Sequence, residues 1–177
     1  MHRISRIFSI FLPLFIIVGC ALQTNSPVNS GANNSELQEG KLSPSIPPQF
    51  SCVPPHNPIE IAYVEKIIDG DTILVMMNGI LYEVRYIGVN APEFDSPQEA
   101  AAQYATDINR GLLQGKTIWM VKDVRERDKY QRLLRFVFVG NIFVNYELVR
   151  LGVAEVKDYP PDLSCQKFFK ELIKDNN

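Results

Sequence analysis

Histidine is scarce in this chain, because only His2 and His56 occur among its 177 residues. Both precede the first strand-like segment, so the sequence argues against histidine catalysis and a histidine-ligated zinc site. A basic excess is also absent, since 18 Lys and Arg stand against 20 Asp and Glu and the net charge is −2. Nucleic-acid-binding modules are usually more basic. A phosphate-binding function would therefore have to rest on a local cluster of charge.

The N-terminus has the composition of an export signal. Arg3 and Arg6 precede an apolar run over residues 7–18, which is too short to span a hydrocarbon core of ~30 Å. The run leads to Gly19-Cys20, which resembles the lipobox of bacterial lipoproteins. We expect a signal peptide over residues 1–19 and a lipid on Cys20, which would anchor the protein on the outer side of the cytoplasmic membrane. The alternative is an ordinary secretory signal with an incidental cysteine, and both interpretations export the protein.

Cysteine is nearly as rare as histidine, with three in the chain. After Cys20 the sequence is rich in Asn, Ser, Gly and Pro without hydrophobic periodicity, so residues 20–58 are expected to form a flexible tether. Cys52 lies at the end of this tether and Cys165 lies near the C-terminus. Two cysteines in an exported protein favour one disulfide. The alternative is a pair of free thiols.

The region from residue 59 onward mixes strand and helix patterns. Asn78-Gly79 is a strong hairpin signal between two strands, and Ser96 with Glu99 matches a capping box at a helix start. From residue 99 on, we expect Ala101, Tyr104, Ala105, Ile108 and Leu112 on the buried face. The expected strands are 59–68, 72–77, 80–89, 117–121 and 133–139, and the expected helices are 96–112, 145–151 and 162–174.

Three short segments, residues 68–72, 85–93 and 128–132, collect side chains suited to phosphodiester chemistry. They supply carboxylates at Asp71 and Glu93 and guanidinium groups at Arg85 and Arg132. Phosphodiester hydrolysis needs such groups to neutralise charge, orient a water and grip phosphate oxygens. Each residue also has an ordinary interpretation, because an Asp-Gly sequence commonly forms a turn and an arginine in a strand commonly faces solvent.

From about residue 59 to 156, these motifs and their order resemble the staphylococcal nuclease family. The resemblance implies a five-stranded oligonucleotide-binding (OB) barrel with three helices over residues 59–177, of mostly β, α+β class. It implies a monomeric, Ca²⁺-dependent nuclease acting on DNA and RNA with little sequence preference and leaving 3′-phosphate ends. The implied roles are calcium binding by Asp71, Asn90 and the Ala91 carbonyl, general base for Glu93, transition-state stabilisation by Arg85 and Arg132, and substrate binding by Lys129 and Tyr130.

The chain departs from the family at two of these positions. Asn90 replaces an aspartate, which removes one negative charge from the expected calcium site. Gln131 replaces a glycine, which would strain the backbone if φ is positive there. These changes leave open a catalytically weak or inactive module that binds nucleic acid or a peptide. A purely structural envelope lipoprotein is disfavoured, because it would not need Glu93 and the two arginines at this spacing.

Overall fold

The computed structural model describes residues 44–95 and 97–175, within a compact unit that starts at Leu42. The expected signal peptide, Cys20 and the tether as far as residue 43 lie outside the described residues. Within the part that is described, no helix is both long and apolar enough to cross a membrane.

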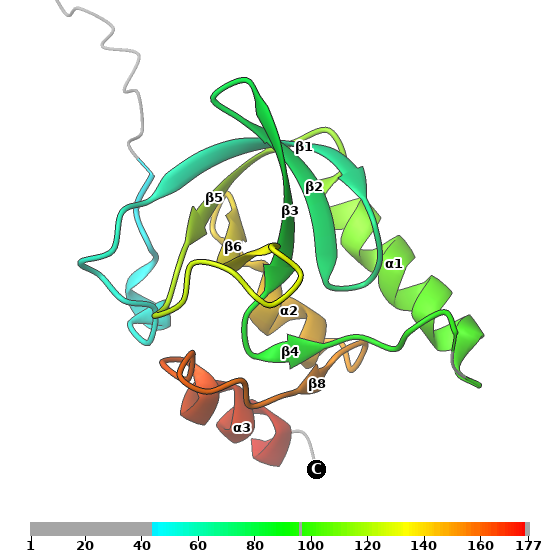
Figure 1. The fold of residues 1–177 in the computed structure, drawn as a ribbon. Helices are drawn as coiled ribbons and strands as arrows, with labels where there is room; N and C mark the ends of the chain where they lie inside the picture. Colours follow the sequence, from blue (N-terminus) through cyan, green and yellow to red (C-terminus); the bar gives the residue numbers. More distant parts are fainter. Residues whose placement is uncertain (1–43, 96, 176–177) are drawn as a thin grey trace, which may run out of the picture. The chain divides into compact units, whose positions relative to one another are not determined.

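Five strands close into a barrel, as predicted (Figure 1). The five strands are β1 (Glu60–Ile67), β2 (Thr72–Met77), β3 (Ile80–Tyr86), β5 (Thr117–Val121) and β6 (Leu133–Val139). Antiparallel pairs join β1 to β2, β2 to β3, β1 to β5 and β5 to β6, and a parallel pair of β3 with β6 completes the circle. The fold class is therefore the α+β, OB-type barrel that the sequence indicated.

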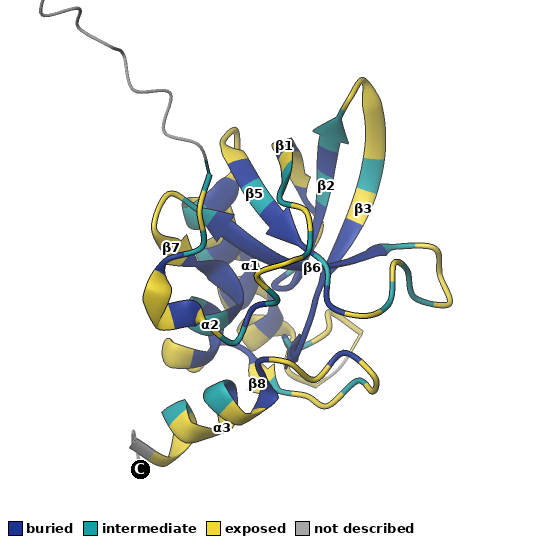
Figure 2. Cartoon of the chain, turned by 90° about the vertical axis from the view of Figure 1, so that its left-hand side faces the viewer, coloured by how far each residue is buried: buried dark blue, intermediate teal, exposed yellow. Residues whose placement is uncertain are grey.

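Alternation along the strands fills the interior of the barrel (Figure 2). Val64, Ile73, Val75, Val84 and Phe136 are each 0% exposed, and burial of such side chains stabilises the fold by roughly 1.5–3 kcal/mol each. The predicted hairpin turn is present between β2 and β3. Its two residues have positive φ, which favours asparagine and glycine there.

Three helices and three short strands complete the unit. Helix α1 (Glu99–Leu113) flanks the barrel, and α2 (Val144–Arg150) and α3 (Gln166–Asp175) lie on the side of β4 and β8 (Figure 1). Strands β4 (Val89–Asn90) and β8 (Glu155–Val156) pair with each other, and β7 (Ile142–Phe143) pairs with β6. The β4–β8 pair brings the chain after β3 close to the segment before α3.

The structure corrects the predicted start of the first helix and part of its buried face. Helix α1 begins at Glu99, and Gln98 precedes it without a side-chain cap; Ser96, the predicted cap, lies outside the described residues. Ala105 is buried and Ile108 and Leu112 pack against the core as predicted, whereas Ala101 and Tyr104 are exposed. The buried face also includes two polar side chains, which have hydrogen-bond partners there. Thr106 donates to the Ala102 carbonyl, and Asn109 accepts from the Tyr86 hydroxyl and donates to the Asp69 carbonyl.

The expected tether is packed in its last part, so its boundary at residue 58 is wrong. A 3-10 turn over Pro48–Phe50 places Phe50 against the rings of Phe143 and Phe168. Val53 is 1% exposed. Cys52 forms a disulfide with Cys165 across 113 residues, with Cα atoms 4.8 Å apart. Buried apolar side chains and the disulfide therefore hold this segment on the domain.

Candidate active site

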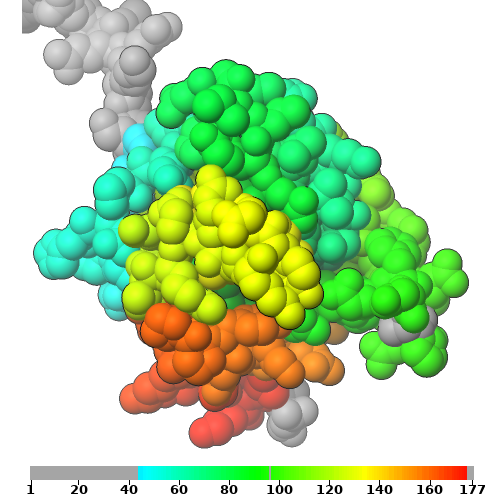
Figure 3. Space-filling view, viewed as in Figure 1, coloured from blue at the N-terminus to red at the C-terminus, as the bar shows by residue number. Residues whose placement is uncertain are grey.

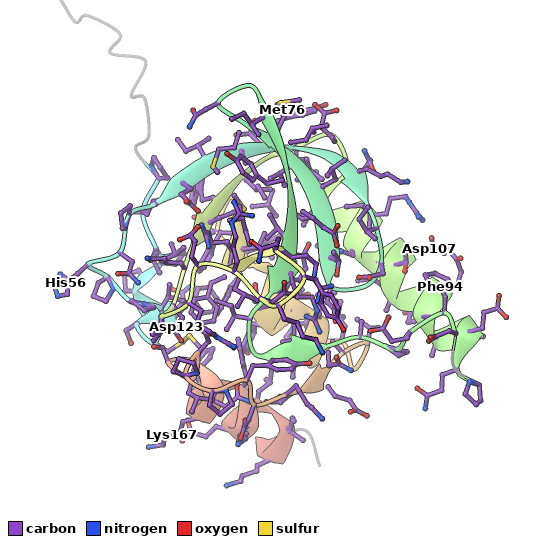
Figure 4. All side chains as sticks on the ribbon, viewed as in Figure 1. His56, Met76, Phe94, Asp107, Asp123 and Lys167 are labelled. Atoms are coloured by element: carbon purple, nitrogen blue, oxygen red, sulfur yellow. A yellow bond between two sulfur atoms is a disulfide. The ribbon has the colours of Figure 1, made fainter. Side chains whose placement is uncertain are left out.

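A cleft of about 380 Å³ opens beside the β5–β6 loop and collects most of the predicted site residues. Arg85, Asn90, Glu93, Lys129, Tyr130 and Arg132 line it. In Figure 3, the loop lies directly against the orange segment that precedes α3. His56 projects at the outer edge of the molecule (Figure 4) and does not line this cleft. Residues from β3, β4 and the loop therefore meet in one cleft, whereas Asp71 and Ala91 are not among the residues that line it.

Arg85, the last residue but one of β3, is held rigidly. Its Nη1 donates to the carbonyls of Tyr86 and Val89, both at 2.9 Å. Its Nη2 donates to Oδ1 of Asn90 at 3.0 Å and lies 3.0 Å from Oδ2 of Asp71. Gly88 has φ +78°, a conformation that glycine adopts without strain, and it turns the chain between β3 and β4. Arg85 as a whole is only 7% exposed, so its position is fixed before any ligand arrives.

Asp71 lies behind Arg85 and is 3% exposed. Its Oδ2 accepts from the Ala91 N–H at 2.6 Å and its Oδ1 accepts from the Thr72 hydroxyl at 3.2 Å. Burial raises the pKa of Asp71 to about 7, against the lowering effect of Arg85. Close packing sets the loop position, because a Cβ on Gly70 would lie 2.6 Å from the Cβ of Ala91.

Asn90 joins the two sides of the cleft. Its Oδ1 accepts from Arg85 and also from the Tyr159 hydroxyl at 3.0 Å. The guanidinium carbon of Arg85 lies 5.8 Å from the centroid of the Tyr159 ring. Burial raises the pKa of the Tyr159 hydroxyl above its ordinary value, which keeps it a hydrogen-bond donor. Tyr159 comes from the segment after β8, which the pairing of β4 with β8 brings alongside.

Asp128 organises the β5–β6 loop. Its Oδ1 accepts from the backbone N–H groups of Tyr130 and Arg132 at 2.9 and 3.0 Å, and its Oδ2 accepts from Nε of Arg132 at 2.8 Å. Burial alone would raise the pKa of Asp128, but the hydrogen bonds from Arg132 outweigh burial and lower it. Tyr130 is 67% exposed. Nζ of Lys129 and the guanidinium carbon of Arg132 lie 4.8 and 5.4 Å from the centroid of its ring.

Gln131 has φ +70°, as the glycine of the family pattern suggested. A side chain in this conformation costs roughly 1 kcal/mol. Nη1 of Arg127 donates to the Gln131 carbonyl at 2.6 Å and helps to hold the loop in this shape.

The residues proposed for calcium fit a hard cation by donor type. Asp71 offers a carboxylate and Asn90 an amide oxygen, which are ligands that Ca²⁺ uses. Over the described part of the chain, no group of three or more His, Cys, Asp or Glu residues could hold a metal ion. With one carboxylate in this pair, further oxygens would have to come from backbone, water or substrate. Nη2 of Arg85 contacts both side chains, so a cation would compete with this arginine.

Two further cleft residues were not among the predicted site residues. Arg125 and Asp162 line the cleft and form an ion pair, with Nε and Oδ2 2.6 Å apart. Arg125 stands within a run of mixed charge, for which a solvated face is the usual interpretation; because the run includes the third motif, the sequence favours a phosphate-facing role for it. Asp162 resembled a helix start, and nothing in the local sequence indicated its partner 37 residues away.

Comparison with known proteins shows the family of the chain. The family model described as staphylococcal nuclease homologue matches residues 83–175, which is more than half of the chain. Similar proteins include a thermonuclease of Staphylococcus hyicus, 32% identical over 63% of this chain and 68% of that protein. A thermonuclease of Staphylococcus intermedius is 34% identical over 56% of this chain and 61% of that protein. The endonuclease YncB of Bacillus subtilis is 36% identical over 52% of this chain and 46% of that protein. The chain belongs to the staphylococcal nuclease homologue family.

Proposed function

We propose that this protein is a nuclease that hydrolyses phosphodiester bonds in DNA and RNA, requires Ca²⁺ and leaves 3′-phosphate ends. The observation that carries the proposal is the meeting of Arg85, Arg132 and Glu93 in one cleft. Two fixed cations and an accessible carboxylate can stabilise a phosphate under attack and accept a proton from the attacking water. The nuclease names of its relatives support the same reaction class.

In this proposal the side chains act on a strand bound along the cleft. Arg85 and Arg132 hold the oxygens of the scissile phosphate and stabilise the charge that builds on them. Glu93, which is exposed and lines the cleft, takes a proton from the water that attacks phosphorus. The bond to the 5′ oxygen breaks and that oxygen takes a proton from solvent. Bound Ca²⁺, held by Asp71, Asn90 and the Ala91 carbonyl, would supply positive charge next to the phosphate.

The cleft offers little to read a base sequence. Apart from Glu93, the groups that it offers to a strand are cations and the ring faces of Tyr130 and Tyr159, which contact phosphates and stack on any base. We therefore expect single-stranded DNA and RNA to be cut with little sequence preference.

A second candidate is a binding module that does not cut. It is favoured by the contact of Arg85 with Asp71 and Asn90, which occupies both side chains proposed for calcium. Incubation of end-labelled single-stranded DNA with Ca²⁺, and in parallel with EDTA, separates the two functions. Cleavage in the presence of Ca²⁺ and not in EDTA supports the nuclease. Its products should be extended by a DNA polymerase only after treatment with a 3′-phosphatase. Binding without cleavage at any Ca²⁺ concentration supports the module.

Export and lipid anchoring at Cys20 remain part of the proposal, as does a monomeric state. Radiolabelled palmitate supplied to expressing bacterial cells should enter the full chain and should not enter a Cys20→Ser variant. Label in both chains, or in neither, would contradict the lipid anchor. Sedimentation of the domain from residue 44 onward would test the monomer.

A further inference from the structure

Arg125 is fixed in the cleft by a buried carboxylate. Asp162 is 1% exposed, and its Oδ1 accepts from the backbone N–H groups of Val124 and Arg125 at 3.0 and 2.8 Å. Its Oδ2 accepts from Nε of Arg125 at 2.6 Å, and Nη2 of Arg125 donates to the Tyr159 carbonyl at 3.0 Å. The arginine therefore ties the β5–β6 loop to the segment before α3, while its side chain remains 40% exposed.

Arg85 and Arg125 differ in how many hydrogen-bond donors they have left for a ligand. A guanidinium carries five N–H groups. Arg85 donates three of them to Tyr86, Val89 and Asn90, and the same Nη2 contacts Asp71. Arg125 donates two, one from Nε and one from Nη2, so among the described residues three of its five N–H groups are uncommitted. Arg125 thus offers more donors to a ligand than Arg85 does.

We infer that Arg125 forms a second phosphate subsite, which binds a backbone phosphate of the nucleic-acid strand next to the one that is cleaved. This inference rests on the proposed function and names a contact beyond its catalytic groups. A strand has one negative charge per nucleotide, so a fixed guanidinium in the same cleft, beyond the two assigned to the scissile phosphate, can contact a neighbouring phosphate. Asp162 sets the orientation of the fork, and the fork suits two phosphate oxygens at once.

A neighbouring lysine provides a matched control. Lys122 lies on the same loop, its side chain is 38% exposed against 40% for Arg125, and it also pairs with a carboxylate, that of Glu126 at 3.7 Å. It is not among the described residues that line the cleft. If only the loss of positive charge matters, Arg125→Met and Lys122→Met should weaken DNA binding to the same extent. If Arg125 forms a specific subsite, only Arg125→Met should change the response to a neutral linkage.

The test replaces one phosphate at a time. A series of fluorescein-labelled oligothymidylates, each with a single uncharged methylphosphonate linkage at a different position, is titrated by anisotropy in EDTA. The full domain is used as wild type, Arg125→Met, Arg125→Lys and Lys122→Met, with circular dichroism to check folding. Arg125→Lys keeps a charge beside Asp162 and guards against a failure of Arg125→Met to fold. Single-turnover cleavage of the same series with Ca²⁺ gives a second readout.

In the wild type, one neutral linkage other than the cleaved one should weaken binding by about ten- to a hundredfold, the range for a hydrogen bond to a charged group. The same linkage should cost Arg125→Met and Arg125→Lys less than about twofold, while Lys122→Met behaves as the wild type. Identical profiles in the wild type and in both Arg125 variants would overturn the subsite. If unmodified DNA is bound but never cleaved, the proposed function fails and the binding profile still decides this inference.

Discussion

Nη2 of Arg85 lies 3.0 Å from Oδ2 of Asp71, so the arginine expected on the phosphate and the carboxylate expected on the cation form a buried ion pair with each other. Both side chains are less than 10% exposed, and removal of either leaves an uncompensated charge. A cation that takes Asp71 would release Arg85 from this contact. The two halves of the proposed chemistry are therefore physically coupled.

Removal of the cleft's reactive groups should abolish most of the activity. Arg85→Ala, Arg132→Ala and Glu93→Ala should each lower the single-turnover cleavage rate of labelled DNA by on the order of 10²–10³, because each removes a preorganised group that acts on the transition state. Lys122→Ala should change mainly the salt dependence. Activity of the three site variants equal to that of Lys122→Ala would remove the nuclease assignment.

Asn90→Asp should tighten calcium binding. The change restores a second carboxylate beside Asp71, and the affinity of calcium sites rises with ligand charge. We expect the dissociation constant, measured by calorimetry without substrate, to fall by roughly tenfold. Asn141→Asp, at an exposed turn, adds the same charge elsewhere and should leave the calcium dissociation constant unchanged. Equal affinities in wild type and Asn90→Asp would argue against a cation at this position.

Asp71 should make stability depend on pH. Its folded-state pKa of about 7 lies above the ordinary aspartate value of ~3.9, so the folded state binds the proton more tightly. The contribution of this group to stability is therefore fully present below pH ~4 and is lost as the pH rises towards 7. In calcium-free urea unfolding, the free-energy difference between wild type and Asp71→Asn should shift in favour of Asp71→Asn between pH 5 and 7.5. A difference that does not change with pH would contradict the raised pKa.

The pairing of Cys52 with Cys165 should be present in the exported protein. A thiol reagent added to the denatured, unreduced domain should find no reactive group from these two cysteines. Replacing both by alanine should lower the free energy of unfolding by roughly 2–4 kcal/mol, because a bridge across a long segment restricts the unfolded chain. Two labelled thiols per domain would show that the bridge does not form in the cell.

Two glycines should respond in opposite ways to the same substitution. A Cβ on Gly70 would meet Ala91 at 2.6 Å and Ala105 at 2.8 Å, so Gly70→Ala should destabilise by roughly 1–3 kcal/mol and displace Asp71. Gly111 lies in α1 with nothing within 4 Å of its Cβ position, so Gly111→Ala should stabilise by about 0.5–1 kcal/mol. Thermal and urea unfolding would measure both. A stable Gly70→Ala protein would show that the loop is not tightly packed.

Local patterns gave most of the secondary structure and missed what distant contacts decide. Strands β2, β5 and β6 have the predicted bounds, because alternation and the Asn78-Gly79 turn are properties of neighbouring residues. The face of α1 was predicted only in part, since polar Thr106 and Asn109 are buried there with partners that periodicity does not reveal. Phe50 and Val53 are likewise buried by residues that are distant in the sequence, although the composition of their own segment suggested no core.

The sequence by itself determined which reactive side chains this protein has and in what order, because the three motifs are local and their residue types limit the chemistry. Only the tertiary structure decided that Arg85 contacts Asp71, that Tyr159 reaches Asn90 across 69 residues, and that Asp162 fixes Arg125 in the same cleft. These contacts depend on the closure of the barrel and on the pairing of β4 with β8. Burial increases the contribution of these contacts to stability, because a charge that is removed from water needs a partner, however distant that partner is in the sequence.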